Sequence, residues 1–362
     1  MNKKNLYWIE LNTQNLKHNI QTYRNRLSLQ SKIAAVIKSN AYGHGIIQIA
    51  KELEQDSNIH TLCVVNSEEG LLLRKEKISK PIMIIGVINS EIEKIVACDL
   101  EPTIYDLSIA QELNDAAKQQ QKTCTIHIKV DTGLSRMGIL PEQLPEYLEA
   151  ISKLKNIRIG SIYSHLAAPA NIDASLKQEQ KLLSLEHNFP THISASKSPT
   201  KSLNQNHALT RLGIGMYGYT NDDQVELRKL LKPVLSLKSR IVFIKTVPAQ
   251  SSIGYDHTFI TKRETRIALL PIGHGDGINL GISNKGRVII CNTIAPMVGK
   301  INMNYIIVDV TDIPECTTED IAIIIGRSKD QEVSLYDWAK HTNLSPTHVV
   351  TNLKPHIPRI CV

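Results

Sequence analysis

At 362 residues and 42% hydrophobic, the chain can bury a sizeable core and is longer than one ordinary domain needs, so we expect two domains. The net charge of +7 is dispersed without a long basic run, which argues against a nucleic-acid partner. No apolar stretch is long enough to cross a bilayer, which argues against a membrane partner and favours a cytoplasmic protein. The six cysteines include no CxxC pair, which fits neither a disulfide framework nor a zinc site, so no metal is expected.

Residues 1–232 alternate apolar, β-branched runs with amphipathic segments of helix length, such as Glu142–Leu154 and Ala174–His187. Strands that alternate with helices in this way predict a (β/α)8 barrel of the TIM type. The eight expected strands are Ile33–Ile37, Thr61–Val65, Ile82–Ile85, Pro102–Tyr105, Cys124–Val130, Ile157–Tyr163, Thr191–Ser194 and Leu212–Tyr217.

After about Lys232 the pattern changes to short strand-like runs separated by Gly, Pro and Asn. Residues 233–362 are therefore expected to form a second, mainly β domain. Its expected strands are Leu235–Thr246, Thr265–Leu270, Arg287–Cys291 and Tyr305–Val310.

Lys38 ends the first expected strand, at the barrel rim where strand ends usually carry chemistry. Taken alone it would be a solvated lysine, but a lysine desolvated at that rim can lose its proton and form a Schiff base with a carbonyl cofactor. Gly43 and Gly45 permit a tight turn that brings the phenol of Tyr42 to the same mouth.

The segment AVIKSNAYGHG at 35–45 resembles the pyridoxal-phosphate lysine motif of the alanine racemase family, and the resemblance covers nearly the whole chain. It implies that Lys38 is linked to pyridoxal 5'-phosphate and that the Tyr42 hydroxyl contacts the phosphate. It also implies an isomerase of D-alanine biosynthesis that interconverts L- and D-alanine.

Further segments extend the implied site. KVDTGLSRMG at 129–138 resembles the family segment that supplies a substrate-binding arginine, here Arg136, and a guanidinium suits a carboxylate. Read without the resemblance, Arg136 would be part of a surface salt bridge. The resemblance also suggests a carbamylated Lys129 that holds Arg136.

His165 and His192 each would more often be a hydrogen-bonded core histidine, but the family gives both a role near the cofactor ring. The phosphate-binding set that the resemblance implies is Ser196 with the backbone amides of Gly213 and Ile214.

Arg211, in RLGIGMYG at 211–218, occupies the position that faces the pyridine nitrogen in the family. A guanidinium only donates hydrogen bonds, so it would keep this nitrogen unprotonated and weaken the ring as an electron sink. Rapid return of a proton to Cα is then favoured over transamination, which suits a racemase.

The second proton carrier that the resemblance implies is Tyr255, in GYDHTF at 254–259; without that motif it would be a tyrosine packed in a β domain. In the family this domain reaches into the partner subunit. Tyr255 and the substrate-contacting Met303 would therefore complete the other chain's site in a homodimer.

Two alternatives stay open beside alanine racemisation. One is a racemase for another small amino acid such as serine, because the family usually has tyrosines where this chain has His274 and Thr347. The other is a non-catalytic pyridoxal-phosphate-binding protein, although such carriers resemble the barrel alone. A decarboxylase of the same fold is disfavoured, because it would place an acid where Arg211 stands. The remaining departures from the family pattern are Ala170, Ala195, Asn302 and Asn304.

Overall fold

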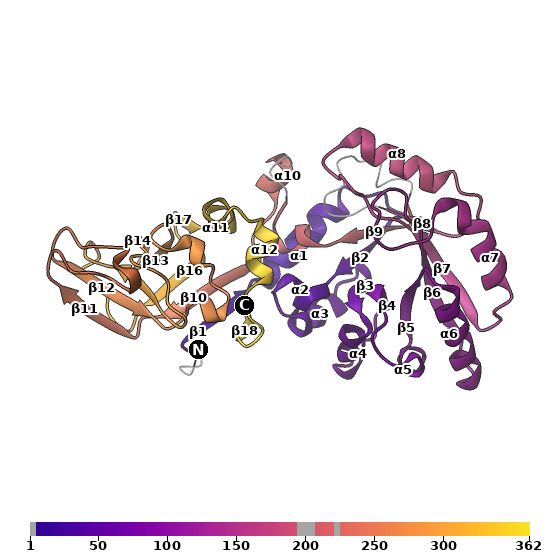
Figure 1. The fold of residues 1–362 in the computed structure, drawn as a ribbon, viewed down its shortest axis with the longest axis horizontal. Coiled ribbons are helices and arrows are strands. Elements are labelled where there is room, and N and C mark those ends of the chain that lie inside the picture. The colour runs from indigo at the N-terminus through magenta and orange to yellow at the C-terminus, as the bar shows by residue number, and fades with distance from the viewer. Residues whose placement is uncertain (1–4, 194–206, 221–224) are drawn as a thin grey trace. The chain divides into compact units, whose positions relative to one another are not determined.

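The computed structural model describes residues 5–193, 207–220 and 225–362, and the chain forms two compact units (Figure 1). The barrel unit comprises Asn15–Ala41 and Ile49–Lys232. The C-terminal unit comprises Met1–Gln14, Tyr42–Gln48 and Pro233–Val362. Its long segment begins at Pro233, and two short segments from the N-terminal part of the chain also belong to it.

The barrel unit is built on one sheet of eight parallel strands in the order β8-β7-β6-β5-β4-β3-β2-β9. The Ala208 N–H, next to β9, donates to the Thr191 carbonyl of β8 (3.2 Å), so the barrel is nearly closed. The predicted (β/α)8 barrel is confirmed. The strands are β2 (Lys32–Val36), β3 (Ile59–Asn66), β4 (Ile82–Val87), β5 (Leu100–Ile104), β6 (Cys124–Lys129), β7 (Ile157–Tyr163), β8 (Thr191–His192) and β9 (Leu209–Leu212).

Helices α4 to α8 lie on the outside of these strands (Figure 1). Helix α6 illustrates why: its buried residues Ala110, Leu113, Ala116 and Ala117 recur at helical spacing and form one apolar stripe. The helices in this part of the chain are α1 (Thr13–Arg24), α2 (Lys38–Tyr42), α3 (Ile46–Glu54), α4 (Ser67–Lys75), α5 (Ile92–Ala97), α6 (Leu107–Gln119), α7 (Leu144–Ser152), α8 (Ile172–Leu183) and α10 (Val225–Leu230).

The expectation of a last barrel strand at Leu212–Tyr217 is wrong. The strand β9 ends at Leu212, and Ile214–Tyr217 forms the 3-10 helix η2, followed by Gly218 with a left-handed φ of 95°. A Cβ atom on Gly215 would lie 2.0 Å from the Tyr23 hydroxyl, so this turn packs against the core at a position that only glycine fits. A short apolar run of this kind does not distinguish a buried strand from a buried helical turn.

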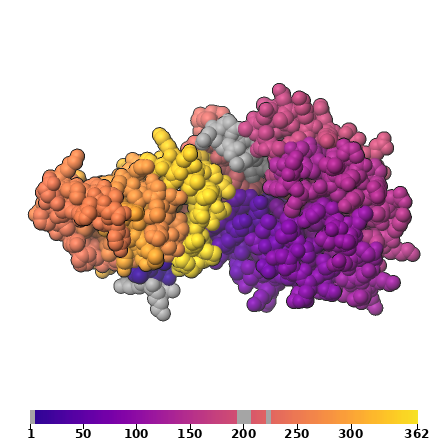
Figure 2. Space-filling view, viewed as in Figure 1, coloured from indigo at the N-terminus to yellow at the C-terminus, as the bar shows by residue number. Residues whose placement is uncertain are grey.

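The C-terminal unit is mainly β, as predicted, and contains a sheet in the order β14-β13-β16-β10-β1-β18 and a smaller sheet β11-β12-β15. The single expected strand Leu235–Thr246 is two strands, β10 and β11, in different sheets. Strand β11 is largely exposed, and it lies in the orange part of the surface in Figure 2. Its strands are β1 (Tyr7–Leu11), β10 (Leu235–Arg240), β11 (Phe243–Val247), β12 (Thr265–Leu270), β13 (Arg287–Ile290), β14 (Thr293–Pro296), β15 (Ile306–Asp309), β16 (Ile321–Ser328), β17 (Gln331–Val333), which pairs with β16, and β18 (Arg359–Cys361), with helices α11 (Leu335–Thr342) and α12 (Pro346–Thr351).

Strand β1 lies between β10 and β18, although it precedes the barrel in sequence. It pairs antiparallel with β10, where Ile9 is opposite Leu237, and parallel with β18, where Ile9 is opposite Arg359. Both ends of the chain therefore contribute to the same sheet. None of the helices in the described ranges is long and apolar enough to span a membrane.

Candidate active site

The half-buried Lys38 lies just beyond the carboxyl end of β2, on a backbone turn of rare conformation. The four residues Ser39–Tyr42 all have left-handed φ angles between 52° and 54°, and Gly43 continues the run at 82°. Each L-residue in a left-handed helical conformation costs about 1–2 kcal/mol. Contacts elsewhere in the fold must therefore stabilise this turn.

The carboxylate of Glu69, on α4, provides such contacts. Its Oε1 accepts the N–H groups of Ser39 (2.7 Å) and Asn40 (3.4 Å), and its Oε2 accepts that of Val65 (3.0 Å). Glu69 is the third residue of α4, after the N-cap Asn66; a glutamate at this position usually bonds back to the N-cap N–H. Here it ties the Lys38 turn to the start of α4 instead.

Four basic side chains, Lys38, Lys129, Arg136 and Arg211, come from the carboxyl ends of barrel strands and perturb one another. Burial lowers the pKa of Lys38; Arg136 and Arg211 lower it further, while Glu69 opposes them. Burial, with Arg211 and Arg136, lowers the pKa of Lys129 to about 7. Such a concentration of positive charge suits an anionic ligand.

The guanidinium of Arg211, 3% exposed, is held by neutral groups. Its Nη2 donates to the Ser164 carbonyl (2.7 Å) and to His165 Nδ1 (3.2 Å), its Nη1 donates to His192 Nδ1, and its Cζ lies 5.0 Å from the ring centroid of Tyr163. In the part of the chain that the structure describes, none of its hydrogen bonds goes to a carboxylate. The charge of Arg211 is therefore not neutralised by direct contact.

His165 follows β7 and faces the same cations. Burial lowers its pKa to about 3, with Arg211, Lys129 and Arg136 contributing. The ring is therefore neutral near pH 7, and its Nδ1 accepts from Arg211.

Arg136 is exposed on the loop that follows β6. The Asp131 carboxylate shapes this loop, because it accepts the N–H groups of Gly133 (2.9 Å), Leu134 (2.8 Å) and Arg136 (2.9 Å). Burial would raise the pKa of Asp131, but these backbone donors hold it below its ordinary value. The loop is thus fixed through its backbone, and the Arg136 side chain stays available.

The structure brings together Lys38, Arg136, His165 and Arg211 in the barrel unit, and Gly213 and Ile214 follow β9 at the same end. The other predicted site residues are placed differently. Tyr42, Tyr255 and Met303 belong to the C-terminal unit, whereas Ser196, like Ala195, lies outside the described residues.

Within the C-terminal unit, Tyr255 and Met303 are 65% and 61% exposed. Tyr255 begins the short 3-10 helix η3 (Tyr255–His257) after Gly254, whose φ is 74°. The Met303 carbonyl accepts the N–H of Gly275 (2.8 Å). Both side chains are therefore presented to the outside of the unit by loops with defined backbone contacts.

Sequence reasoning missed Glu69 and Tyr163. The ring of Tyr163 lies under two cations, with Lys129 Nζ 4.8 Å and Arg211 Cζ 5.0 Å from its centroid. Burial raises the pKa of Tyr163 to about 12, so it remains a neutral phenol. Its only sequence signal was its position two residues before His165, at the end of an expected strand.

Comparison with known proteins gives matches along almost the whole chain. The family models "Alanine racemase, N-terminal domain" and "Alanine racemase, C-terminal domain" match residues 11–221 and 234–361. A protein of Methylacidiphilum infernorum named alanine racemase is 35% identical over 357 residues, which covers 97% of this chain and 92% of that protein.

Solved structures agree in fold. An alanine racemase of Clostridium difficile superposes with a TM-score of 0.90 at 29% identity, covering 99% of this chain and 96% of the other. An alanine racemase of Bartonella henselae, described with covalently bound pyridoxal phosphate, has a TM-score of 0.84 at 25% identity and covers 99% of each chain.

Proposed function

This chain belongs to the alanine racemase family, and we propose that it interconverts L- and D-alanine with two proton carriers, Lys38 and Tyr255: one removes the Cα proton, and the other returns a proton to the opposite face of Cα. The match to both family domains argues against a non-catalytic carrier that resembles the barrel alone. The guanidinium of Arg211 argues against a decarboxylase, which would have an acid in that place.

The barrel residues fit pyridoxal 5'-phosphate. The half-buried Lys38, whose pKa is lowered, is a nucleophile for its aldehyde, and the surrounding basic side chains suit its phosphate and the substrate carboxylate. Bound there, the cofactor delocalises the negative charge that Cα acquires when its proton leaves. The residues that would hold it are Lys38, Tyr42, His165, Ser196, Arg211, Gly213 and Ile214.

In this proposal each residue of the chain has a defined task. The unprotonated Lys38 amine accepts the Cα proton on one face, and the Tyr255 hydroxyl serves the opposite face. Arg136 binds the substrate carboxylate through its guanidinium, beside Met303. Arg211 only donates, so it holds the ring nitrogen as an acceptor.

The proposal includes a homodimer in which the C-terminal unit of one chain completes the barrel site of the other. The exposure of the Tyr255 and Met303 side chains supports it, because both are accessible to a second chain. Phe243 and Tyr305, 53% and 42% exposed, belong to the same unit. We also propose a cytoplasmic location, because the structure joins no two of the six cysteines, all within the described ranges, by a disulfide.

The observation that carries the proposal is the half-buried Lys38 among three further basic side chains, on a turn held by Glu69. Borohydride reduction of the holoenzyme should fix the cofactor to Lys38, and peptide mapping should find the label there. Lys129, the buried lysine of the cluster, is the matched control and should stay unlabelled. A label on Lys129, or none at all, would contradict the proposal.

We further propose that Lys129 takes up carbon dioxide as a carbamate. Its unprotonated Nζ attacks the carbon of CO2, an N–C bond forms and one proton is released. The resulting anion would offset the charges of Arg136 and Arg211, which help to lower the pKa of Lys129 to about 7.

Because the neutral amine predominates only above that pKa, a carbamate signal from 13C-bicarbonate should be strong in the NMR spectrum at about pH 8 and weak at about pH 6. The Lys129→Ala variant should lack it. A signal that persists in this variant would assign the carbamate elsewhere and refute the proposal.

A further inference from the structure

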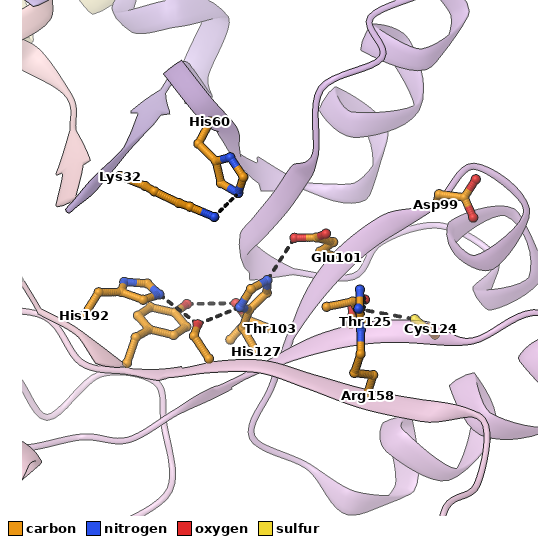
Figure 3. A network of polar contacts seen from close by, with 12 residues as sticks. Lys32, His60, Asp99, Glu101, Thr103, Cys124, Thr125, His127, Arg158 and His192 are labelled. Atoms are coloured by element: carbon orange, nitrogen blue, oxygen red, sulfur yellow. Dashed lines mark hydrogen bonds and ion pairs between the residues drawn. The ribbon is translucent and has the colours of Figure 1, made fainter. Parts of the chain in front are cut away.

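A line of polar side chains runs over four neighbouring barrel strands from His192 to Glu101 (Figure 3), and Arg211 bonds to its His192 end. His192 Nε2 is 2.9 Å from Ser161 Oγ, which is 2.7 Å from His127 Nδ1, and His127 Nε2 is 3.1 Å from Glu101 Oε2. The strands β8, β7, β6 and β5 are neighbours and contribute one residue each, in that order. Backbone register places His127 directly opposite Ser161.

The protons in this line can all point the same way. A guanidinium only donates, so Nδ1 of His192 must accept from Arg211. Burial, reinforced by Arg211 and His127, lowers the pKa of His192 well below its ordinary value, so this ring is neutral and carries its proton on Nε2. That N–H donates to Ser161.

The hydroxyl proton of Ser161 then has Nδ1 of His127 as its acceptor. With Nδ1 occupied in this way, a neutral His127 carries its proton on Nε2 and donates it to Glu101. Every donor in the line is thus matched with one acceptor, and every hydrogen-bond dipole runs from the guanidinium toward the carboxylate. Aligned bonds of this kind strengthen one another in a dry interior.

The line also explains how the interior of the barrel accommodates the buried positive charge of Arg211. This side chain is 3% exposed and contacts no carboxylate among the described residues, and its positive charge helps to lower the pKa of Lys38 and Lys129. His192 and Ser161, 0% and 5% exposed, exclude water between Arg211 and Glu101. An unpaired buried charge is costly, so a polarised route to a carboxylate stabilises it.

We propose that Glu101, His127 and Ser161 are positioning residues that act through His192 to orient the guanidinium of Arg211. This inference rests on the proposed function, in which Arg211 holds the ring nitrogen of the cofactor. None of the three touches cofactor or substrate in this scheme. Their task is to keep Nδ1 of His192 free of a proton, so that Nη1 of Arg211 has a fixed acceptor.

Nitrogen-15 NMR of histidine-labelled holoenzyme reports the proton positions directly and does not depend on activity. His192 and His127 should each show an unprotonated Nδ1 and a protonated Nε2. Glu101→Gln should shift the His192 resonances although the two residues do not touch. A doubly protonated His127 would overturn the proposal. It would also be overturned if the His192 resonances did not shift in Glu101→Gln.

Glu179→Gln is the matched control. Glu179 also bonds a buried histidine of the barrel, His207 (2.9 Å), whose other nitrogen meets Thr191 (3.3 Å), so this pair does not enter the line. The His192 resonances should change less in Glu179→Gln than in Glu101→Gln. An equal change would mean that the response reports barrel electrostatics in general, which would also overturn the proposal.

Kinetics and the cofactor absorbance then test the consequence. Glu101→Gln and Ser161→Ala should each lower kcat roughly tenfold, in the range seen for outer residues that orient a reactive group, with KM for alanine nearly unchanged and the cofactor band shifted. If the wild type does not racemise alanine, the proposed function is wrong. The NMR measurements then still test the proton positions along the line from Arg211 to Glu101. If the wild type is active and both folded variants match it in kcat and absorbance, the positioning role is wrong.

Discussion

Mixing an inactive Lys38→Ala variant with an inactive Tyr255→Phe variant should restore about a quarter of the wild-type racemase activity. Each variant alone lacks one of the two proton carriers, and racemisation needs both transfers. In a mixed dimer one site inherits both lesions, whereas the other combines an intact Lys38 with an intact Tyr255. Random exchange makes about half of the dimers mixed, and each of these has one good site of two.

The control pairs Lys38→Ala with Arg136→Met. Both substitutions lie in the barrel unit, so every site of a mixed dimer keeps one lesion and activity should stay at the level of the single variants. Chain exchange is verified by mass spectrometry of the mixture. If Lys38→Ala and Tyr255→Phe exchange chains and remain inactive, the shared site does not exist.

Replacing Glu69 by glutamine should lower kcat by roughly a hundredfold, because the turn that carries Lys38 loses its acceptor and a displacement of about 1 Å has that effect on a reacting group. The carboxylate accepts N–H groups through both oxygens, whereas the glutamine amide has one acceptor oxygen. The free energy of unfolding should fall as well, because one of these exposed or part-buried N–H groups loses its acceptor in the protein.

Removing the negative charge of Glu69 should also change the pKa of Lys38. Its carboxylate opposes the lowering of the Lys38 pKa, so the pKa of Lys38 should fall further in Glu69→Gln. Glu68→Gln is the matched control, since Glu68 precedes it on α4 but is exposed. The measurements are kcat, the thermal midpoint and the pH dependence of the cofactor band. Equal behaviour of the two variants would show that Glu69 does not hold the turn.

The barrel and the position of Lys38 could be predicted because they depend on local sequence. Alternating apolar strands and amphipathic helices fix the fold class, and Lys38 lies where such a strand ends. The left-handed turn after it could not be predicted, since Ser39, Ala41 and Tyr42 are residue types that rarely adopt positive φ. The turn depends on Glu69, and that contact exists only in the folded barrel.

The line from Arg211 to Glu101 could not be predicted from the sequence for a related reason. Its members lie on separate strands, and His127 and Ser161 become neighbours through the register of β6 and β7. A strand sequence gives the side that a residue faces but not its partner on the next strand. The family resemblance placed His192 near the cofactor ring, but nothing in the sequence pointed to its partners Ser161, His127 and Glu101.

The pairing of β1 with β10 and β18 has a consequence for how the protein is made. On the ribosome β1 emerges first, while its two partners follow only after the whole barrel sequence, and domains fold in the order of synthesis. The barrel strands can pair with their sequence neighbours at once, whereas β1 has no partner until β10 has been synthesised beyond the barrel. The C-terminal sheet therefore depends on a pairing between segments far apart in the sequence, and such pairings form slowly.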